Sequence, residues 1–360
     1  MNLSVRWLLC LTFHLLAGAS AWACTICAPT DAQNTVVQRL FAADAVVLAS
    51  TQAGGSGWRA LEVIKGESPK APITLVDLAP GQAGRGAPAT WLLTYSAGSE
   101  SWRALGSLSL ARADWVRRLL AMRRAADTPV DAWPQRVAYF APDFESDEAL
   151  VAQAAYEEVS VASYAVMRTL KPALDAAKLT QWLAAPELAA RRPLYTLLLG
   201  MAGDDAAAVA LQARLLGPTS ALNLGEHSAL FAAYLEIRGS VGLEWVEQQL
   251  LRDPARPEQD LQAALLALSV HGNDGVRLSR ERVVQAYAAF IRHNPSRAGM
   301  VASDLGNWER WEFVPDFAAI LKSGAPQAFA SRYSMVFYLM RSPTPAAREV
   351  LQALRAANLL

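Results

Sequence analysis

The chain has 360 residues, of which 53% are hydrophobic, and its 33 basic and 33 acidic residues give a formal charge of zero. This length is enough for two domains, and a chain without net charge has no long-range field that would favour nucleic acid or an anionic membrane. The sequence has no nucleophile elbow, Walker loop or zinc-protease motif, and the glycine-rich residues 81–86 lack the lysine and hydroxyl of a phosphate loop. We therefore expect no catalytic residues, no cofactor and no nucleic-acid partner.

The first 23 residues have the order of a secretory signal peptide. One positive charge, Arg6, precedes the apolar residues 7–16, and small residues then lead to Ala21-Trp22-Ala23. These are the charged, apolar and cleavage regions of an export signal, and the apolar run is short for a membrane span. We predict cleavage between Ala23 and Cys24, an extracytoplasmic (periplasmic or secreted) location, and no membrane span afterwards. The alternatives are an uncleaved anchor and a lipid anchor on Cys24.

Cys24 and Cys27 are the cysteines that remain after this cleavage. In an oxidising compartment their C-x-x-C spacing predicts a disulfide bond. Thiol–disulfide exchange is an alternative function, but a redox pair normally follows a strand and opens a helix, and here Pro29 lies two residues after Cys27. Zinc binding is disfavoured because one C-x-x-C supplies only half a site.

Residues 24–126 are predicted to form a small β module that ends in a linking helix. A short helix is expected at residues 35–41, and strands at residues 45–49, 58–64, 73–78, 91–95 and 102–110. Five short strands with apolar residues on one side favour a small closed barrel of the OB type. The linking helix at residues 111–126 has an apolar stripe, and we interpret the arginines on its other side as a solvated face rather than an anion-binding surface.

Three features of this module resemble the netrin-like module of tissue inhibitors of metalloproteinases. They are Cys24 at the mature N-terminus, the stretch from Phe41 to Ala49, and the sequence Val-Ile-Lys-Gly that ends the second predicted strand at Gly66. The resemblance implies that the amine and carbonyl of Cys24 bind the zinc of a partner protease and that Thr25 enters its specificity pocket. The inhibitors have C-x-C and further cysteines, both of which this chain lacks, so inhibition is an alternative function.

Residues 127–360 carry a repeat of the form Leu-x-apolar-x-Gly. Its glycines are Gly203, Gly239 and Gly272, and later prolines follow each unit at Pro218, Pro254 and Pro295. Each glycine is predicted to end a helix as a left-handed cap. Asp204, Ser240 or Asp274 would cap the next helix, and the proline would mark its end. Such helix pairs cannot bury their apolar faces alone, so they are predicted to stack as an α-solenoid.

This region resembles HEAT-like repeats, and residues 136–140, 154–158 and 304–311 resemble the helical half of uncharacterised exported bacterial proteins. For Glu157 and Glu158 we expect capping or ion pairing rather than acid–base chemistry, because neighbours in a helix point to different faces. Trp308 and Trp311 are expected in the core. His227 and His271 are expected near helix ends.

The predicted fold is therefore a multi-domain α+β chain: a five-stranded OB-like barrel followed by a HEAT-like solenoid. The predicted function is that of an exported, non-enzymatic scaffold, which binds a protein or peptide partner through its helical surface. The sequence identifies neither the partner nor the oligomeric state.

Overall fold

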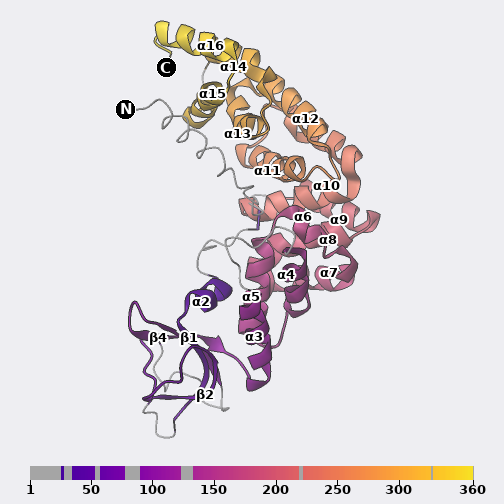
Figure 1. The fold of residues 1–360 in the computed structure, drawn as a ribbon. Coiled ribbons are helices and arrows are strands. Elements are labelled where there is room, and N and C mark those ends of the chain that lie inside the picture. The colour runs from indigo at the N-terminus through magenta and orange to yellow at the C-terminus, as the bar shows by residue number, and fades with distance from the viewer. Residues whose placement is uncertain are drawn as a thin grey trace, which may run out of the picture. The chain divides into compact units, whose positions relative to one another are not determined.

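The computed structural model describes residues 26–27, 35–52, 57–77, 90–122, 133–218, 222–325 and 327–359. The chain divides into two compact units, Met1–Leu170 and Lys171–Leu360. Figure 1 shows the strands in the first unit and a succession of helices in the second. The predicted cleavage site at Ala23, the pair Cys24 and Thr25, and the signal segment lie outside the described residues.

A four-stranded antiparallel sheet forms the centre of the first unit. Its strands are β1 (Ala45–Thr51), β2 (Trp58–Lys65), β3 (Trp91–Ser96) and β4 (Ser101–Ser107), in the spatial order β2-β1-β3-β4. The inner strand β1 is buried from Ala45 to Ala49. Val47, Trp58 and Leu93 belong to the apolar cluster on this sheet. The alternation in the sequence thus predicted four of the strands at the right places.

The fifth predicted strand, at residues 73–78, is not a strand over its described part. Ile73 exchanges two backbone hydrogen bonds with Trp58 on β2, both 2.9 Å long, and Val76 N then donates to Trp102 O on β4 at 3.2 Å. Since β2 and β4 are the two edges of the sheet, this segment leaves one edge and reaches the other within three residues. It is too short to form a ladder with either strand, which is why it makes isolated bridges.

Five α-helices among the described residues complete the first unit. They are α2 (Val36–Ala42), α3 (Ala113–Ala121), α4 (Trp133–Phe140), α5 (Ala149–Ser160) and α6 (Tyr164–Arg168). Helix α2 packs against α3, α5 and β3, and α5 also packs against β4, so α5 lies beside the sheet module in Figure 1. Helices α4 and α5 therefore belong to the same compact unit as the sheet, since α5 packs on α2 and β4 and α4 packs on α5.

The second unit is helical throughout its described residues. Its α-helices are α7 (Ala176–Ala184), α8 (Arg192–Ala202), α9 (Asp205–Leu216), α10 (Leu224–Val246), α11 (Glu258–Asp274), α12 (Arg280–His293), α13 (Ala302–Asn307), α14 (Val314–Lys322), α15 (Phe329–Arg341) and α16 (Pro345–Ala356). Helices α8, α9 and α11 all pack against α10, and α15 packs against α13, α16 and the 3₁₀ helix η9 (Pro295–Val301). No helix in the described part of the chain has the length and apolar character needed to cross a bilayer.

The repeat glycines have three different roles instead of one. Gly203 is the C-cap of α8 but has an extended conformation, with φ of −75°. Gly239 has a positive φ of 56° with a ψ of −134°, at a kink inside α10. Gly272 lies inside α11, and the left-handed cap of that helix is Gly275. The prediction that each repeat glycine ends a helix as a left-handed cap was therefore wrong for Gly203 and Gly272, and Gly239 forms a kink within α10 instead of such a cap.

The other repeat signals were partly right. Asp204 caps α9 by accepting hydrogen bonds from two backbone amides, as predicted. Ser279, not Asp274, caps α12, because α11 continues to Asp274. The three prolines all follow the end of a helical segment, as predicted: they are Pro218, Pro254 and Pro295.

Candidate binding surfaces

Glu157 and Glu158 support the structure from two different faces of α5. The Glu157 Oε2 atom accepts a hydrogen bond of 2.7 Å from Val36 N, at the start of α2. The Glu158 carboxylate forms a buried ion pair with the Arg136 guanidinium. These contacts confirm the predicted capping and ion-pairing roles, and the two carboxylates do not meet in one site.

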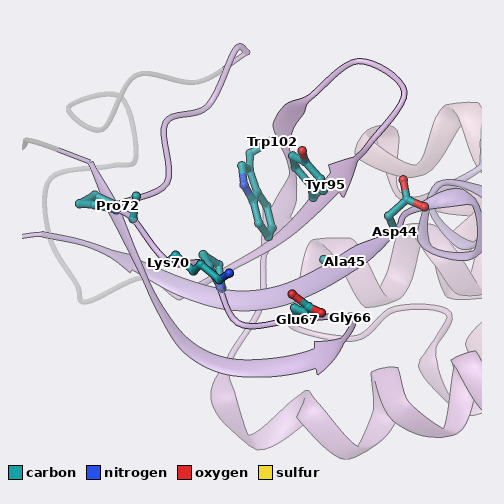
Figure 2. A pocket seen from close by; sticks show the side chains of 10 residues that line it. Asp44, Ala45, Gly66, Glu67, Lys70, Pro72, Tyr95 and Trp102 are labelled. Carbon is teal, nitrogen blue, oxygen red and sulfur yellow. The ribbon is translucent and has the colours of Figure 1, made fainter.

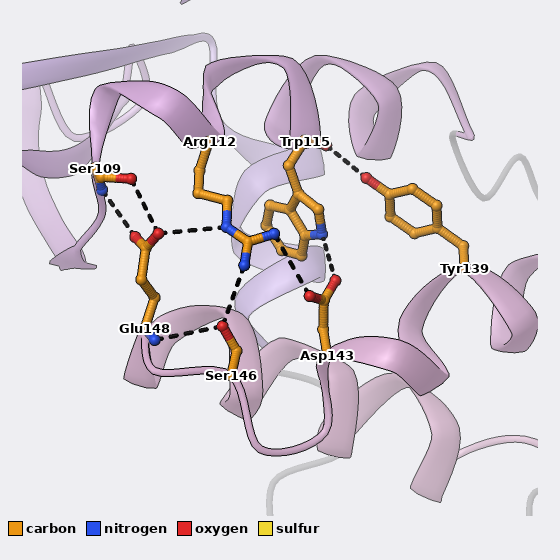
Figure 3. A network of polar contacts seen from close by, with 7 residues as sticks. All are labelled: Ser109, Arg112, Trp115, Tyr139, Asp143, Ser146 and Glu148. Carbon is orange, nitrogen blue, oxygen red and sulfur yellow. Dashed lines mark hydrogen bonds and ion pairs between the residues drawn. The ribbon is translucent and has the colours of Figure 1, made fainter. Parts of the chain in front are cut away.

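Two arginines, Arg112 just before helix α3 and Arg117 within it, are paired with carboxylates. Arg112 contacts Asp143 at 3.5 Å and Glu148 at 3.3 Å in the network shown in Figure 3. Trp115 Nε1 donates to the other oxygen of the Asp143 carboxylate at 3.0 Å. Arg117 pairs with Glu62 and with Asp114. Because these charges are compensated, the network in Figure 3 fastens α3 to the segment before α5 and offers no anion site.

The two buried histidines lie near helix ends, as predicted. His227 is in the first turns of α10, and burial lowers its pKa, partly offset by Asp260, whose carboxylate is 3.7 Å away. His271 lies in the last turn of α11, with its Nε2 atom 2.9 Å from Ala232 O. The described residues contain no group of three or more metal-ligating side chains.

Trp308 and Trp311 are packing residues. The Trp308 ring stacks on Tyr287 with centroids 5.7 Å apart, and its Nε1 atom donates to Asn273 at 2.8 Å. Trp311 packs against Tyr338 with ring centroids 5.2 Å apart. The expected core role is confirmed for Trp308, which is buried.

A polar groove runs between α11, η9 and α13 in the second unit. It encloses about 330 Å³ and is lined by Gln262, Leu265, Leu266, Ser269, Met300 and Asp304. A smaller hollow of about 120 Å³ shares Gln262 and Met300 with it and reaches Ala330 and Ser334 on α15. The two hollows therefore adjoin, and we call them together the α11–α15 groove.

Asp304 is a largely buried ionisable group of this groove, which is also lined by Glu258 and Arg297. Its carboxylate accepts hydrogen bonds from Tyr287 Oη at 2.7 Å and Ser269 Oγ at 2.9 Å. Burial raises the pKa of Asp304, although these two hydrogen bonds lower it, and burial also raises the pKa of Tyr287. Both donors fix the orientation of the Asp304 carboxylate. We therefore interpret these three side chains as a hydrogen-bonding group of the groove and not as a catalytic pair.

Helix α15 carries an exposed aromatic stripe next to this groove. The exposed fractions are 84% for Phe329, 62% for Tyr333, 43% for Phe337 and 61% for Met340. The rings of Phe329 and Tyr333 stack with centroids 6.4 Å apart, and those of Tyr333 and Phe337 with centroids 6.3 Å apart. We call these four side chains the α15 stripe. The sequence shows this four-residue spacing, but it gave no indication that the rings are exposed.

Other residues of α15 hold the stripe in place. Met335, Tyr338 and Leu339 are buried on the side that packs into the unit. Residues three or four apart share a helix face, so Ala330 and Ser334, which line the groove, lie on the face next to Tyr333 and Phe337. The stripe and the α11–α15 groove are thus neighbouring parts of one surface.

A second hollow lies on the sheet module of the first unit (Figure 2). It encloses about 510 Å³, and its lining residues are Asp44, Ala45, Gly66, Glu67, Pro69, Lys70, Ala71, Pro72, Tyr95 and Trp102. The two rings come from β3 and β4, and the charged residues lie just before β1 and just after β2. We call this hollow the sheet pocket.

The Lys65-Gly66 pair positions the floor of the sheet pocket. The Lys65 Nζ atom donates to the carbonyls of Phe41, at 3.1 Å, and Ala43, and so binds the C-terminal end of α2. Gly66 has a φ of 78°, and a Cβ there would lie 2.6 Å from Asp44 O. The sequence motif therefore brings the end of β2 directly against the start of β1, which a larger residue at position 66 would prevent.

The predicted N-terminal site, Cys24 and Thr25, is not among the residues that the structure describes. Cys27 is buried, while Ala23, Cys24 and Thr25 lie outside the part of the chain that the structure describes. The disulfide bond and the inhibitory role of Cys24 and Thr25 therefore stay predictions. The chain matches no family model, and no curated protein and no solved structure is significantly similar to it.

Proposed function

We propose that this protein is an exported, non-enzymatic interaction protein, and that it binds a protein or peptide partner through the α15 stripe and the α11–α15 groove. The exposed stripe is the observation that carries the proposal. Three aromatic rings and Met340 are held in contact with water on one helix face. Contiguous apolar patches of this kind, next to polar groups, are typical of protein-binding surfaces.

The energetics favour a partner on this surface. Covering one exposed aromatic ring stabilises a complex by about 2 kcal/mol. The rings are already ordered by stacking on each other, and Arg341 lies over the Phe337 ring, 5.9 Å from its centroid. Binding therefore loses little side-chain entropy at these positions. Gln262 and Ser334 in the adjacent groove supply hydrogen-bonding groups for a peptide backbone.

We also propose two details of the fold, a HEAT-like solenoid in the second unit and an OB-like barrel in the first. A HEAT-like solenoid is supported by several helices of the second unit that pack on the next helix in the chain, as α9 does on α10, α10 on α11, α11 on α12 and α15 on α16. An OB-like barrel is supported by the segment after Pro72, since Ile73 and Val76 bond to the two opposite edges of the sheet. A solenoid would present α15 as part of an extended binding surface.

Affinity capture with matched variants tests the function. The tagged protein, its Tyr333→Ala/Phe337→Ala variant and a Leu216→Ala/Val241→Ala control would each be isolated from the exported fraction. Leu216 and Val241 are exposed apolar residues of the same unit outside the stripe. We expect one partner to co-purify with the wild type and the control and to be lost from the stripe variant. Equal recovery with all three proteins would contradict the proposal.

The two N-terminal alternatives have their own tests. Inhibition of a metalloprotease requires a free amine on Cys24, so one extra residue before Cys24 should abolish it. Inhibition that persists in the extended protein would contradict that mechanism. Thiol exchange requires an accessible sulfur, and the burial of Cys27 favours a structural disulfide instead. Exchange activity that disappears in Cys27→Ser would favour the redox function.

A further inference from the structure

The sheet pocket combines two aromatic rings that stand side by side. Tyr95 on β3 and Trp102 on β4 are register partners, so their side chains project from the same face of the sheet. Their ring centroids are 5.2 Å apart with an angle of 41° between the ring planes, and Figure 2 shows them together at the hollow. Both rings are half-buried, so each leaves part of its surface open to a ligand.

The charges around these rings are predominantly acidic. Asp44 and Glu67 line the pocket, against one cation, Lys70. The Asp44 Oδ2 atom accepts a hydrogen bond of 2.6 Å from Ala97 N, which fixes that carboxylate at the pocket wall. Glu67 and Lys70 form no hydrogen bond or ion pair with the residues that the structure describes. The pocket therefore has acceptor groups that its own basic residue does not neutralise.

The paired aromatic rings and the carboxylates of the pocket together favour the binding of a planar cation. A guanidinium group stacks on Trp and Tyr rings and simultaneously donates hydrogen bonds to carboxylates, whereas an ammonium group is more strongly hydrated and has no planar face. The carbon chain of such a residue packs on apolar walls, which Pro69 and Pro72 provide here. The volume of about 510 Å³ leaves room for the backbone on either side of the cationic residue.

We propose that the sheet pocket binds the arginine side chain of an extended peptide. The guanidinium group lies against Trp102 and Tyr95 and donates to Glu67 and Asp44. Lys70 opposes the bound cation and so limits the affinity. This site lies in the first unit and does not involve the α15 stripe, so its test is independent of the test of the proposed function.

Titration of the full chain with blocked peptides tests this site. The probe is an N-acetylated, C-amidated decapeptide of Gly, Ser and Pro with one central Arg, compared with peptides that carry citrulline, Lys or Glu at that position. Citrulline keeps the shape of arginine without its charge. We expect the Arg peptide to bind about tenfold more tightly than the citrulline and Lys peptides, and the Glu peptide to bind weakest.

Three variants connect the binding to the pocket. Glu67→Gln should weaken the Arg peptide about five- to tenfold, and Lys70→Gln should strengthen it about two- to fivefold, since one removes an attraction and the other a repulsion. Asp147→Asn is the matched control, because Asp147 is an exposed carboxylate of the same unit outside the pocket. It should leave binding unchanged. All variants should have the thermal midpoint of the wild type.

Three results would overturn the proposal. The first is equal affinity for the Arg and citrulline peptides, and the second is equal affinity for the Arg and Lys peptides. The third is an affinity for the Arg peptide that changes neither in Glu67→Gln nor in Lys70→Gln.

Discussion

The Arg136 guanidinium and the Glu158 carboxylate form an ion pair inside the first unit, with Nη2 and Oε2 2.5 Å apart. The side chains are only 7% and 1% exposed, so each charge depends on the other for solvation. Arg136 also donates to Met122 O at 2.9 Å and lies over the rings of Phe41 and Phe140. The pair thus ties α4 and α5 to α2 and to the end of α3.

Removing one charge of this pair should therefore strongly destabilise the first unit. Glu158→Gln leaves the guanidinium buried without a counter-charge, and we expect the free energy of unfolding of the first unit to fall by about 3–5 kcal/mol. Glu157→Gln, one residue away, weakens the contacts to Val36 N and to Gln153 Nε2 and should lower this free energy by about 1 kcal/mol. Urea unfolding followed by circular dichroism measures both, and equal losses would show that the buried pair has no special role.

Gly66 should be intolerant of a side chain. Gly66→Ala combines a left-handed backbone with a Cβ that lies 2.6 Å from Asp44 O, so we expect a loss of about 2–4 kcal/mol. Gly275→Ala is the control, because Gly275 has a φ of 68° but no atom within 4 Å of the added Cβ. It should lose only about 1 kcal/mol, from backbone strain alone. Thermal unfolding of both variants checks this, and similar losses would contradict the close contact.

Gly272 and Trp308 should be energetically coupled. A Cβ at position 272 would lie 2.5 Å from Cη2 of the Trp308 ring, so Gly272→Ala should destabilise the second unit by about 2 kcal/mol or more. In a Trp308→Phe background that ring atom is absent, and the same change should have a much smaller effect. A double-mutant cycle measures the coupling. Strictly additive losses would mean that the two residues do not touch.

His227 should make the second unit less stable in mild acid. Burial lowers the pKa of His227 below its usual 6.5, so the unfolded chain takes up a proton before the folded chain does. Stability should therefore fall as the pH drops below about 6.5. In His227→Gln this part of the pH dependence should disappear. Unfolding at pH 7.5 and pH 5.5 compares the two proteins, and an identical pH dependence would contradict the shift.

Local patterns in the sequence were sufficient for the strands and for several helix ends. The pattern of apolar residues located β1 to β4. Asp204 could be identified as an N-cap because its carboxylate can accept hydrogen bonds from the first backbone amides of the alanine-rich helix that follows it. The segment after Pro72 was overpredicted. Its apolar residues look like a strand, but they bond to two different edges, and this division depends on the whole sheet.

Long-range packing explains what the sequence could not show. Gly272 looked like a cap, but its missing Cβ accommodates Trp308, 36 residues further along the chain. Helix α5 is bound to the sheet module by contacts such as the hydrogen bond of 2.8 Å that Ser109 N donates to the Glu148 carboxylate. No local pattern in the sequence reveals such a contact. In the same way, the spacing of Phe329, Tyr333 and Phe337 predicts a helix face, but only the packing of Tyr338 and Leu339 determines that this face is the exposed one.

Site-specific photo-crosslinking at the α15 stripe tests the proposed function most directly. A photoreactive phenylalanine would replace Tyr333 in one protein and Val241, an exposed residue of the same unit, in another. On irradiation in the exporting cells, we expect one discrete adduct from position 333 and none from position 241. No adduct at position 333, or the same adducts from both positions, would contradict the proposal that this stripe is the binding surface.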